Sequence, residues 1–576
     1  MLAVILDGYT DEPAGLGVPP YLDVYPRYVA GAIWHLCPEA TVKYFTVDQA
    51  RSDFEYFQKI CSKADLLIVI AGVCVPGKYL GGDPIKLDEL IKWSSLLSSK
   101  VKILGGPVAK FGYGEEGGKI AVEPKFFDNY YDIVVKGDIE IVIRDFILEK
   151  FSVEKIDPCA TRENYSEIKE FAVKGALIAR QHPCFGKNLI CEIETYRGCP
   201  RFVVGGCSFC TTVRYGKVTY RDPKDIVSEV RALHNVGVKH FRLGRQADFY
   251  TYMAKDTGKS EFPEPSPEAI EKLLRGIRLN APKIETLHID NVNPGTIYHH
   301  KEKSIEVTKI LMKYHTPGDV AAFGVESADP RVVKLNNLKV MPDEAFEAIR
   351  ILNEVGSIRG WNGLPEILPG VNFVCGLIGE TRETYRLNFK FLRRVLEEGL
   401  LLRRINIRQV LAFPGTPMWG VGNKIIRRHK KYFRWFKEKV RREIDQPMLM
   451  KLVPLGTVLK RAFTEKHYGK ATYARQPGSY PLLLYCPEKL PLHRYYDFAV
   501  VGYGYRSVIV VPYPLNVNRA PVSLLELIPG IGRKKALEIK LKRPFKSLEE
   551  VEKLLDSKEA LKYLSLGEKH EAERIL

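Results

Sequence analysis

Three closely spaced cysteines are the strongest chemical signal in the sequence. Cys199, Cys207 and Cys210 lie in the segment RGCPRFVVGGCSFC with the spacing Cys-x7-Cys-x2-Cys. Two thiolates two residues apart can bind one inorganic core without strain, and a third from the same loop leaves one iron of an iron–sulfur cluster without a protein ligand. A structural zinc site would need a fourth Cys or His nearby. Three unrelated thiols are the remaining alternative.

The residues around these cysteines resemble the radical S-adenosylmethionine (radical SAM) superfamily. Phe209 lies between the last two cysteines, and Ile193–Pro200 (IETYRGCP) leads into the first. The usual spacing in that superfamily is Cys-x3-Cys-x2-Cys, so the first gap is longer here. Three later segments resemble superfamily motifs in the right order: FGVESADPRVVKLNNLK, GLIGET and PGTP.

This resemblance implies both the cofactors and a set of site residues. The three cysteines would bind a 4Fe-4S cluster whose open iron holds S-adenosylmethionine, and one electron would cleave it to methionine and a 5′-deoxyadenosyl radical. A donor such as ferredoxin or flavodoxin would supply the electron. The residues that the resemblance places beside S-adenosylmethionine are Phe209, Gly244, Glu326, Ser327, Gly376, Gly379 and Glu380.

One position departs from the superfamily pattern. Many members have Gly-Gly-Glu facing the amino group of S-adenosylmethionine, whereas this chain has Gly244, Arg245, Gln246 and Asp248 there. The contact to the amino group is therefore unassigned. Three further residues could be core or capping residues, or could act near the substrate: Cys375, His288 and Asp290.

Alternating strands and helices are expected to position the cysteine loop. From about residue 190 to 420 the alternation has the period of a (β/α) barrel, whose active site lies at the carboxyl ends of the strands. The predicted strands with their loops are Val238–Phe249, Ile284–Pro294, Val320–Pro330, Val371–Thr381 and Ile405–Met418.

Residues 1–150 predict a separate Rossmann-like domain. Apolar runs such as Leu2–Tyr9 and Ala64–Gly72, bounded by glycine, are typical of parallel strands covered on both faces. Val101–Pro107 and Tyr131–Glu140 resemble the cobalamin-binding-type domain that precedes some radical SAM barrels. Cobalamin is thus a possible further cofactor, although the Asp-x-His-x-x-Gly motif that supplies a cobalt ligand is absent.

The same region is also similar to the N-terminal domain of tRNA methylthiotransferases. That domain holds an auxiliary cluster on three cysteines, for which Cys37, Cys61 and Cys74 are the candidates here. Their spacing is tighter than in that family. The alternative is that all three are core residues, because free cysteine is often buried as a small apolar side chain.

Composition favours a polyanionic partner. The net charge is +18 and the pI about 9.2, and release of counterions from phosphates drives binding of basic proteins. A thermophile's charged surface is the alternative. No apolar run is long enough to span a membrane, and the N-terminus predicts a strand and no signal peptide. Eleven cysteines, mostly in apolar segments, fit a reducing cytosol, so we expect a cytoplasmic protein.

The C-terminal third predicts three nucleic-acid-binding elements. Residues 421–447 predict a basic amphipathic helix, which either docks by its aromatic face with a merely solvated basic side or also binds nucleic acid on that side. Residues 448–513 predict a small β-barrel that resembles the TRAM domain, an OB-like RNA-binding barrel. Residues 514–576 resemble a helix-hairpin-helix, whose glycines let backbone N–H groups face a phosphate, unless the hairpin serves only packing. The predicted phosphate contacts are Gly530, Ile531, Gly532, Lys534 and Lys535.

These features together predict a radical SAM enzyme that modifies a nucleic acid, with tRNA favoured over DNA. Methylthiolation, methylation or another carbon functionalisation would be the reaction. The arrangement resembles archaeal radical SAM proteins with a C-terminal helix-hairpin-helix. The alternatives are a cobalamin-assisted methyltransferase acting on a small molecule or protein, and a nucleic-acid-binding protein with a structural cluster.

Overall fold

The N-terminal part of the chain is a five-stranded parallel sheet in the order β3-β1-β4-β5-β6. The structure, a computed structural model, describes residues 1–9, 20–72, 82–115 and 117–567. Counted along the chain within this sheet, the order is 2-1-3-4-5, the flavodoxin-like arrangement of doubly wound folds. Its strands are β1 (Leu2–Asp7), β3 (Thr41–Thr46), β4 (Leu66–Ile70), β5 (Val101–Gly105) and β6 (Ile133–Val134).

Both faces of this sheet are apolar, because its central strands are continuous apolar runs. Strand β1 reads LAVILD and β4 reads LLIVI. Ile5 and Ile68 belong to one core cluster with helix α1, whereas Leu6 and Val69 belong to another with helix α3. The helices of this part are α1 (Val24–Leu36), α2 (Val47–Ser52), α3 (Phe54–Cys61), α4 (Leu87–Leu96), α5 (Pro107–Phe111), α6 (Ile139–Leu148) and α7 (Lys169–Lys174).

Two further parallel sheets, β11-β10-β7-β2 and β12-β13-β14-β15, form a partial barrel. Strand β2 comes from the N-terminal part of the chain and pairs with β7, so the chain enters the barrel before it completes the first sheet. The strands are β2 (Tyr21–Leu22), β7 (Ile190–Glu194), β10 (His240–Gly244), β11 (Thr286–Ile289), β12 (Asn291–Val292), β13 (Asp319–Glu326), β14 (Ile367–Cys375) and β15 (Arg404–Gln409).

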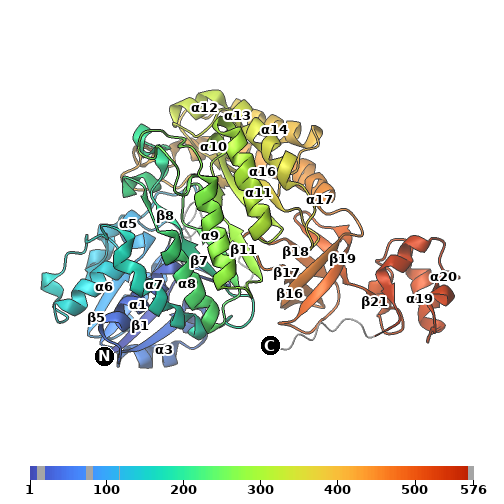
Figure 1. The fold of residues 1–576 in the computed structure, drawn as a ribbon, viewed down its shortest axis with the longest axis horizontal. Coiled ribbons are helices and arrows are strands. Elements are labelled where there is room, and N and C mark those ends of the chain that lie inside the picture. Colours follow the sequence, from blue (N-terminus) through green and yellow to red (C-terminus); the bar gives the residue numbers. More distant parts are fainter. Residues whose placement is uncertain (10–19, 73–81, 116, 568–576) are drawn as a thin grey trace.

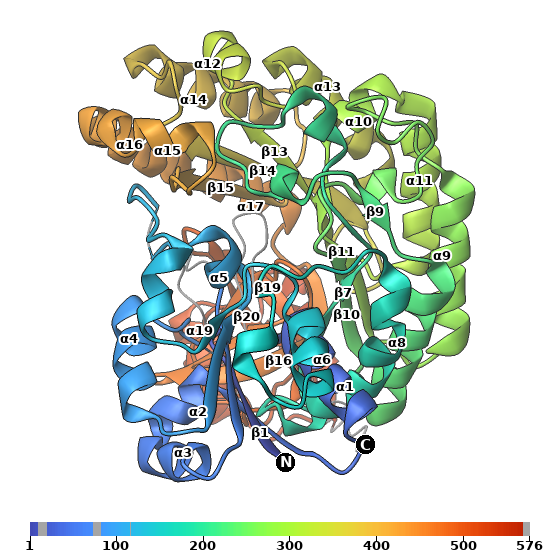
Figure 2. The same ribbon diagram turned by 90° about the vertical axis from the view of Figure 1, so that its left-hand side faces the viewer.

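Amphipathic helices cover the outside of this barrel (Figure 2). Helix α9 buries Ile270, Leu273, Leu274 and Ile277, the spacing that aligns apolar side chains on one helical face. The covering helices are α8 (Pro223–Val236), α9 (Pro267–Asn280), α10 (Pro294–His299), α11 (Lys301–Tyr314), α12 (Pro330–Leu335), α13 (Pro342–Gly356) and α14 (Arg382–Glu397).

A loop of the N-terminal part lies against the last barrel strand. The N–H of Gly118 donates to the carbonyl of Val410 at 2.8 Å, and the N–H of Ala121 donates to that of Ala412 at 2.9 Å. These bonds extend the barrel beyond β15. The N-terminal part therefore touches both edges of the partial barrel, β2 beside β7 on one side and this loop beside β15 on the other.

The small barrel of the C-terminal part and the helices after it lie on the side of the larger barrel away from the N-terminal sheet (Figure 1). The C-terminal part contains a closed five-stranded barrel in the order β16-β17-β18-β20-β19. Its elements are α15 (Pro417–Val421), α16 (Lys424–Val440), α17 (Gln446–Leu452), β16 (Val458–Tyr468), β17 (Ala471–Arg475), β18 (Leu483–Cys486), β19 (Tyr495–Tyr503), β20 (Ser507–Pro512), β21 (Leu515–Asn516), α18 (Val522–Leu525), α19 (Arg533–Leu541), α20 (Leu548–Glu552) and β22 (Leu564–Ser565).

The loop between β17 and β18 joins the small barrel to the larger one. The N–H of Ser479 donates to Nδ1 of His288 at 3.0 Å, and its hydroxyl donates to the carbonyl of Ile289 at 3.1 Å. Tyr480 packs with Val320 and Ala322 of β13. The small barrel is thus held against the barrel strands by a buried polar loop.

The predicted fold class is confirmed: parallel α/β sheets are followed by a closed five-stranded β-barrel. Within the described residues, no helix combines the length and the apolar character that crossing a membrane requires.

Candidate functional site

The cysteine loop is folded by glycines that permit left-handed backbone. Cys199 follows the short strand β8 (Tyr196–Arg197), and a 3-10 turn, Pro200–Val204, leads away from it. Gly205 and Gly206 have φ values of 81° and 67°, a region that side chains with a Cβ rarely adopt. The chain then returns, and the N–H of Cys210 donates to the carbonyl of Cys207 at 3.1 Å.

All three predicted ligands line one cavity at the mouth of the barrel. It contains about 1390 Å³ of space free of protein atoms, including its opening. Because strand side chains alternate between two faces, one residue in two on each barrel strand points inward. The strand residues that line the cavity are Glu192, Glu194, Arg242, Asn291, Gly324, Glu326, Asn372, Val374 and Arg408.

The thiols share the cavity without converging on one point. Among the described residues, no three His, Cys, Asp or Glu side chains lie as a single metal ion would require. The thiols of a cluster bind different irons, so a wider spacing fits a cluster and does not fit a tetrahedral zinc site. Burial raises the pKa of Cys199 to about 11 and that of Cys207 to about 12. Bound iron would favour the thiolates, because metal ligands must be deprotonated.

Two cations that the sequence analysis did not single out lie beside the thiols. Arg201 donates through Nη1 to Sγ of Cys207 at 3.2 Å and to the carbonyl of Asn337 at 2.8 Å. Lys339 is fully buried; although burial lowers its pKa, negative charge at Cys207 and Glu326 raises it overall. Lys339 ends the quoted segment FGVESADPRVVKLNNLK, so a signal for it was present in the sequence.

Glu326 is the inward-facing acid at the end of β13. Its φ of 63° is unusual for a residue with a side chain, and such strain is often found at functional sites. Burial raises its pKa to about 7, and its Oε2 is buried without a hydrogen-bond partner. A Cβ on Gly324 would lie 2.5 Å from Oε1 of Glu326 and 2.7 Å from Nζ of Lys339, so a larger residue there would displace these two side chains. A cluster with a polar ligand fits this set of groups: the three thiols, the unpartnered carboxylate of Glu326 and the buried ammonium of Lys339.

The residues at the Gly-Gly-Glu position have other partners. Arg245 lines the cavity and pairs with Asp23 at 3.1 Å, and it donates to the hydroxyl of Tyr25 at 2.6 Å. Asp248 accepts from the hydroxyl of Thr296 at 2.6 Å and does not line the cavity. The side-chain contact to the amino group of S-adenosylmethionine therefore stays unassigned.

Of the predicted S-adenosylmethionine contacts, Phe209 and Glu326 are among the residues that line the cavity and the others are not. Glu380 accepts from the N–H groups of Gly376 and, at 2.9 Å, of Leu377, and it shapes the turn after β14. Ser327 accepts from the N–H of Asp329 at 3.2 Å. That Gly244, Ser327, Gly376, Gly379 and Glu380 contact S-adenosylmethionine stays a prediction.

The three further candidates differ in their positions. Asp290 lines the cavity and accepts a hydrogen bond from the hydroxyl of Tyr480. His288 has both ring nitrogens engaged, by the N–H of Ser479 and by the carbonyl of Thr316 at 3.0 Å. Cys375 is buried, and burial raises its pKa. Asp290 is therefore the one of the three that faces the cavity.

The suggested auxiliary cluster does not fit the N-terminal sheet. Cys37 packs at the edge of the core cluster that contains α1, whereas Cys61 belongs to the cluster on the opposite face of the sheet. Two cysteines on opposite faces of a sheet cannot bind one cluster. Cys74, the third candidate, lies outside the described residues. Cys61 is a core residue, and Cys37 is half-buried at the edge of the core.

The predicted phosphate contacts lie at the far end of the molecule, beyond the small barrel (Figure 1). Gly530 has a φ of 87°, and Ile531 is buried beneath the hairpin. A Cβ on Gly532 would meet nothing within 4 Å, so the start of α19 is open. Lys534 is exposed, whereas Lys535 pairs with Asp556.

Comparison with known proteins shows the family. The Radical SAM superfamily profile matches residues 193–392. The uncharacterized protein MJ0274 of Methanocaldococcus jannaschii is 48% identical over 517 residues, which are 88% of this chain and 92% of that protein. An uncharacterized protein of Archaeoglobus fulgidus is 45% identical over 568 residues, 98% of this chain and all of that protein.

Among solved structures, the cobalamin-dependent S-adenosylmethionine radical enzyme OxsB is similar at a TM-score of 0.45 and 13% identity. The match covers 76% of this chain and 56% of OxsB. Family membership makes the chain an enzyme and excludes the alternative of a binding protein with a structural cluster. Its cofactors are a 4Fe-4S cluster and S-adenosylmethionine, for which the three cysteines that line the cavity stay the predicted site, and the chain belongs to the radical SAM superfamily.

Proposed function

We propose that this radical SAM enzyme modifies a nucleic acid, with tRNA as the favoured substrate. The observation that carries the proposal is the distribution of charged residues on helix α16. It buries Ile426, His429, Phe436 and Val440 and turns its cations to solvent. None of these exposed cations has an ion-pair partner within the described part of the chain. They are Lys424, Arg427, Arg428, Lys430, Lys431, Arg434 and Lys437.

An unpaired row of cations is what a phosphate backbone needs. Surface cations that serve only solubility are commonly balanced by carboxylates, as on α13, where Arg350 pairs with Glu347 at 2.6 Å and with Glu354 at 2.9 Å. Phosphates can neutralise the cations of α16 and release counterions, which favours binding. The open backbone at Gly532 supports a second phosphate contact, and small closed barrels of the OB type bind oligonucleotides.

The barrel residues would orient the cofactors and exclude water. Bound together, the cluster and S-adenosylmethionine supply a 5′-deoxyadenosyl radical that abstracts hydrogen from an unactivated carbon. Arg201 donates to the Cys207 sulfur, and Lys339 places a positive charge beside it. Opposite these cations, Glu192 pairs with Arg242 inside the barrel, and Glu326 offers a free carboxylate oxygen. The charged interior can hold a polar substrate group against the reacting centre.

Anaerobic reconstitution followed by mass spectrometry tests this function. The protein is supplied with iron, sulfide, S-adenosylmethionine and a reductant, and total tRNA or a DNA duplex is added. We expect 5′-deoxyadenosine to form, more quickly with tRNA, and digested tRNA from a deletion strain to lack one modified nucleoside. An unchanged set of tRNA nucleosides would contradict the proposal. A cobalamin spectrum in the purified protein would favour the methyltransferase alternative.

A further inference from the structure

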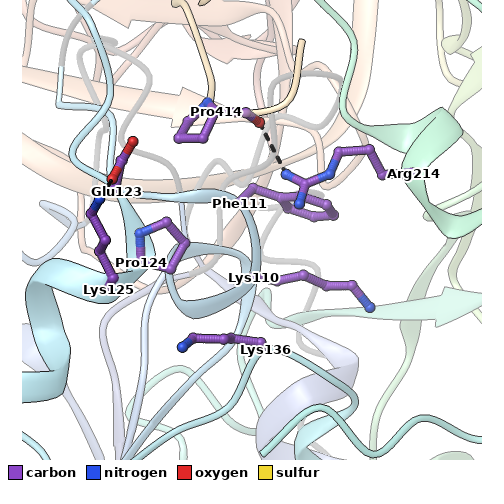
Figure 3. Close-up of a pocket in the computed structure, with 8 residues that line it drawn as sticks. All are labelled: Lys110, Phe111, Glu123, Pro124, Lys125, Lys136, Arg214 and Pro414. Carbon is purple, nitrogen blue, oxygen red and sulfur yellow. Dashed lines mark hydrogen bonds and ion pairs between the residues drawn. The ribbon is translucent and has the colours of Figure 1, made fainter.

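A second hollow lies directly behind the cysteine loop. It contains about 680 Å³ of space free of protein atoms, including its opening. Its lining residues are Lys110, Phe111, Glu123, Pro124, Lys125, Lys136, Arg214 and Pro414 (Figure 3). The two cavities share the 3-10 turn Thr212–Tyr215. Thr212, Val213 and Tyr215 line the cluster cavity, whereas Arg214 between them lines the hollow. A ligand in the hollow would thus sit one residue away from the wall of the catalytic cavity.

Arg214 is held in place but not neutralised. Its Nη1 donates to the carbonyl of Pro414 at 3.1 Å, and its guanidinium lies 5.3 Å from the centre of the Phe111 ring. No carboxylate pairs with Arg214 in the described ranges of the chain. A stacked guanidinium with free N–H groups is preorganised for a phosphate.

The lysines of the hollow add positive charge from separate elements. Lys110 ends α5 and lies 3.6 Å from Asp138, but Asp138 also binds Arg197 at 2.6 Å and cannot neutralise both. Burial lowers the pKa of Lys110, and the positive charge of Arg197 lowers it further, so an anion would be stabilised beside it. Lys136 follows β6, and its contact with Asp128 is long, at 3.5 Å. Only Lys125 has a close partner in the lining, Glu123 at 2.8 Å.

We propose that this hollow binds a phosphate group of the nucleic-acid substrate next to the nucleotide that enters the cluster cavity. The inference rests on the proposed function. The loop that leads to Glu123 packs against the start of α16: a Cβ on Gly422 would lie 3.1 Å from Ile120, and one on Gly118 would lie 3.3 Å from Ile426 of α16. A strand bound along α16 would thus lie near the loop that carries one wall of the hollow. An acidic electron donor is the competing partner, but a concave site fits a single phosphate better than a flat protein surface.

Binding of tRNA to the full-length protein over a range of salt concentrations tests the site. The variant carries Arg214→Gln and Lys136→Gln. The control carries Arg180→Gln and Lys59→Gln, two exposed cations elsewhere, so that both variants lose the same charge. Each lost phosphate contact should lower the slope of log K against log salt by about 0.7–0.9. We expect a reduction of about that size and a several-fold loss of affinity for the variant only.

The outcomes separate this site from the proposed function. If wild-type protein does not bind tRNA, the proposed function fails and the inference with it. If wild-type protein binds tRNA and the two variants behave alike, the inference alone is wrong. The inference is also wrong if the Arg214 variant binds tRNA like the wild-type protein and is impaired only in reduction of its cluster by flavodoxin. Inorganic phosphate is the second probe: if phosphate protects Arg214 from phenylglyoxal and tRNA does not, the hollow holds a free anion and no substrate phosphate.

Discussion

The N-terminal sheet and the barrel are built from the same parallel strands and outer helices, yet their interiors differ. Strands β1 and β4 bury apolar side chains on both faces. Strand β7 reads ICEIE: Cys191 and Ile193 join the apolar core, whereas Glu192 and Glu194 face the cavity. An ion costs several kcal/mol to bury unless it is paired, so a charged interior is a poor way to gain stability. The difference locates the chemistry in the barrel.

The buried barrel charges are compensated by partners from other segments. Glu194 pairs with Arg162 at 2.7 Å, and Glu192 pairs with Arg242 of the neighbouring strand. Other buried charges have fewer partners: Oε2 of Glu326 and Nη1 of Arg404 have no hydrogen-bond partner, and Lys339 lies beside Glu326 and the cysteines. Incomplete pairing therefore includes the carboxylate that lines the predicted cofactor cavity.

The largest expected effect separates cysteines of the two regions. Cys199→Ala should abolish the 4Fe-4S cluster and 5′-deoxyadenosine formation, because two thiolates cannot hold the cluster securely. Cys61→Ala, in the apolar core of the N-terminal sheet, should retain full iron content. Iron and sulfide analysis with the visible spectrum measures both. Loss of iron from the Cys61 variant would contradict the expected difference between the two regions.

The N-terminal sheet contains one buried acid that should affect stability and not activity. Burial raises the pKa of Asp7 to about 7. Because the folded state favours the protonated form, the contribution of Asp7 to stability is full below about pH 4 and is lost as the pH rises from there to about 7. The loss is at most about 4 kcal/mol. Hydrogen exchange of the β1 amides should show this fall in wild type and a flat profile in Asp7→Asn, with unchanged 5′-deoxyadenosine formation.

The next effect concerns the cation beside the cluster thiols. Arg201→Ala removes the donor to the Cys207 sulfur, and loss of such an outer-shell contact typically lowers metal affinity or activity about 10–100-fold. A more negative midpoint potential in a redox titration would distinguish loss of this hydrogen bond from misfolding. Arg180→Ala, an exposed arginine, is the control. An unchanged potential would show that the contact does not tune the cluster.

The smallest effect concerns charges that are not buried at all. Arg427→Gln with Arg428→Gln on α16 should change the free energy of unfolding by less than about 0.5 kcal/mol, since exposed sites tolerate substitution. The affinity of this double variant for tRNA should fall several-fold at low salt and less at high salt, because salt screens exposed charges. Filter binding and thermal unfolding measure the two effects. A stability loss without a change in affinity would contradict the proposed role of α16.

Several features were predictable because they depend on local patterns. The apolar runs that became β1, β4 and β5 were recognisable from composition and length. The barrel strands ending near Gly244, Glu326 and Cys375 were recognisable from alternating segments with glycine-bearing loops. The three thiols on one loop were predictable because their spacing alone keeps them close. Phe209 lies between two of them and necessarily shares their surroundings.

Only the tertiary structure decided which distant segments of the chain lie in contact. Tyr21–Leu22 joins the barrel sheet although it precedes most of the N-terminal sheet. Glu326 ends strand β13, and its side chain lines the cavity. Glu380 follows strand β14, but its carboxylate accepts a hydrogen bond from the backbone of its own loop. The hollow around Arg214 is built from five separate segments.

The sequence by itself determined the chemistry, since three thiolates on one loop can be recognised without a fold. The tertiary structure decided how that chemistry is tuned and what can reach it. Lys339 lies beside the thiols only because β13 and the segment after α12 pack against the cysteine loop. Such contacts depend on backbone dihedrals and packing across long sequence separations, and no local periodicity encodes them.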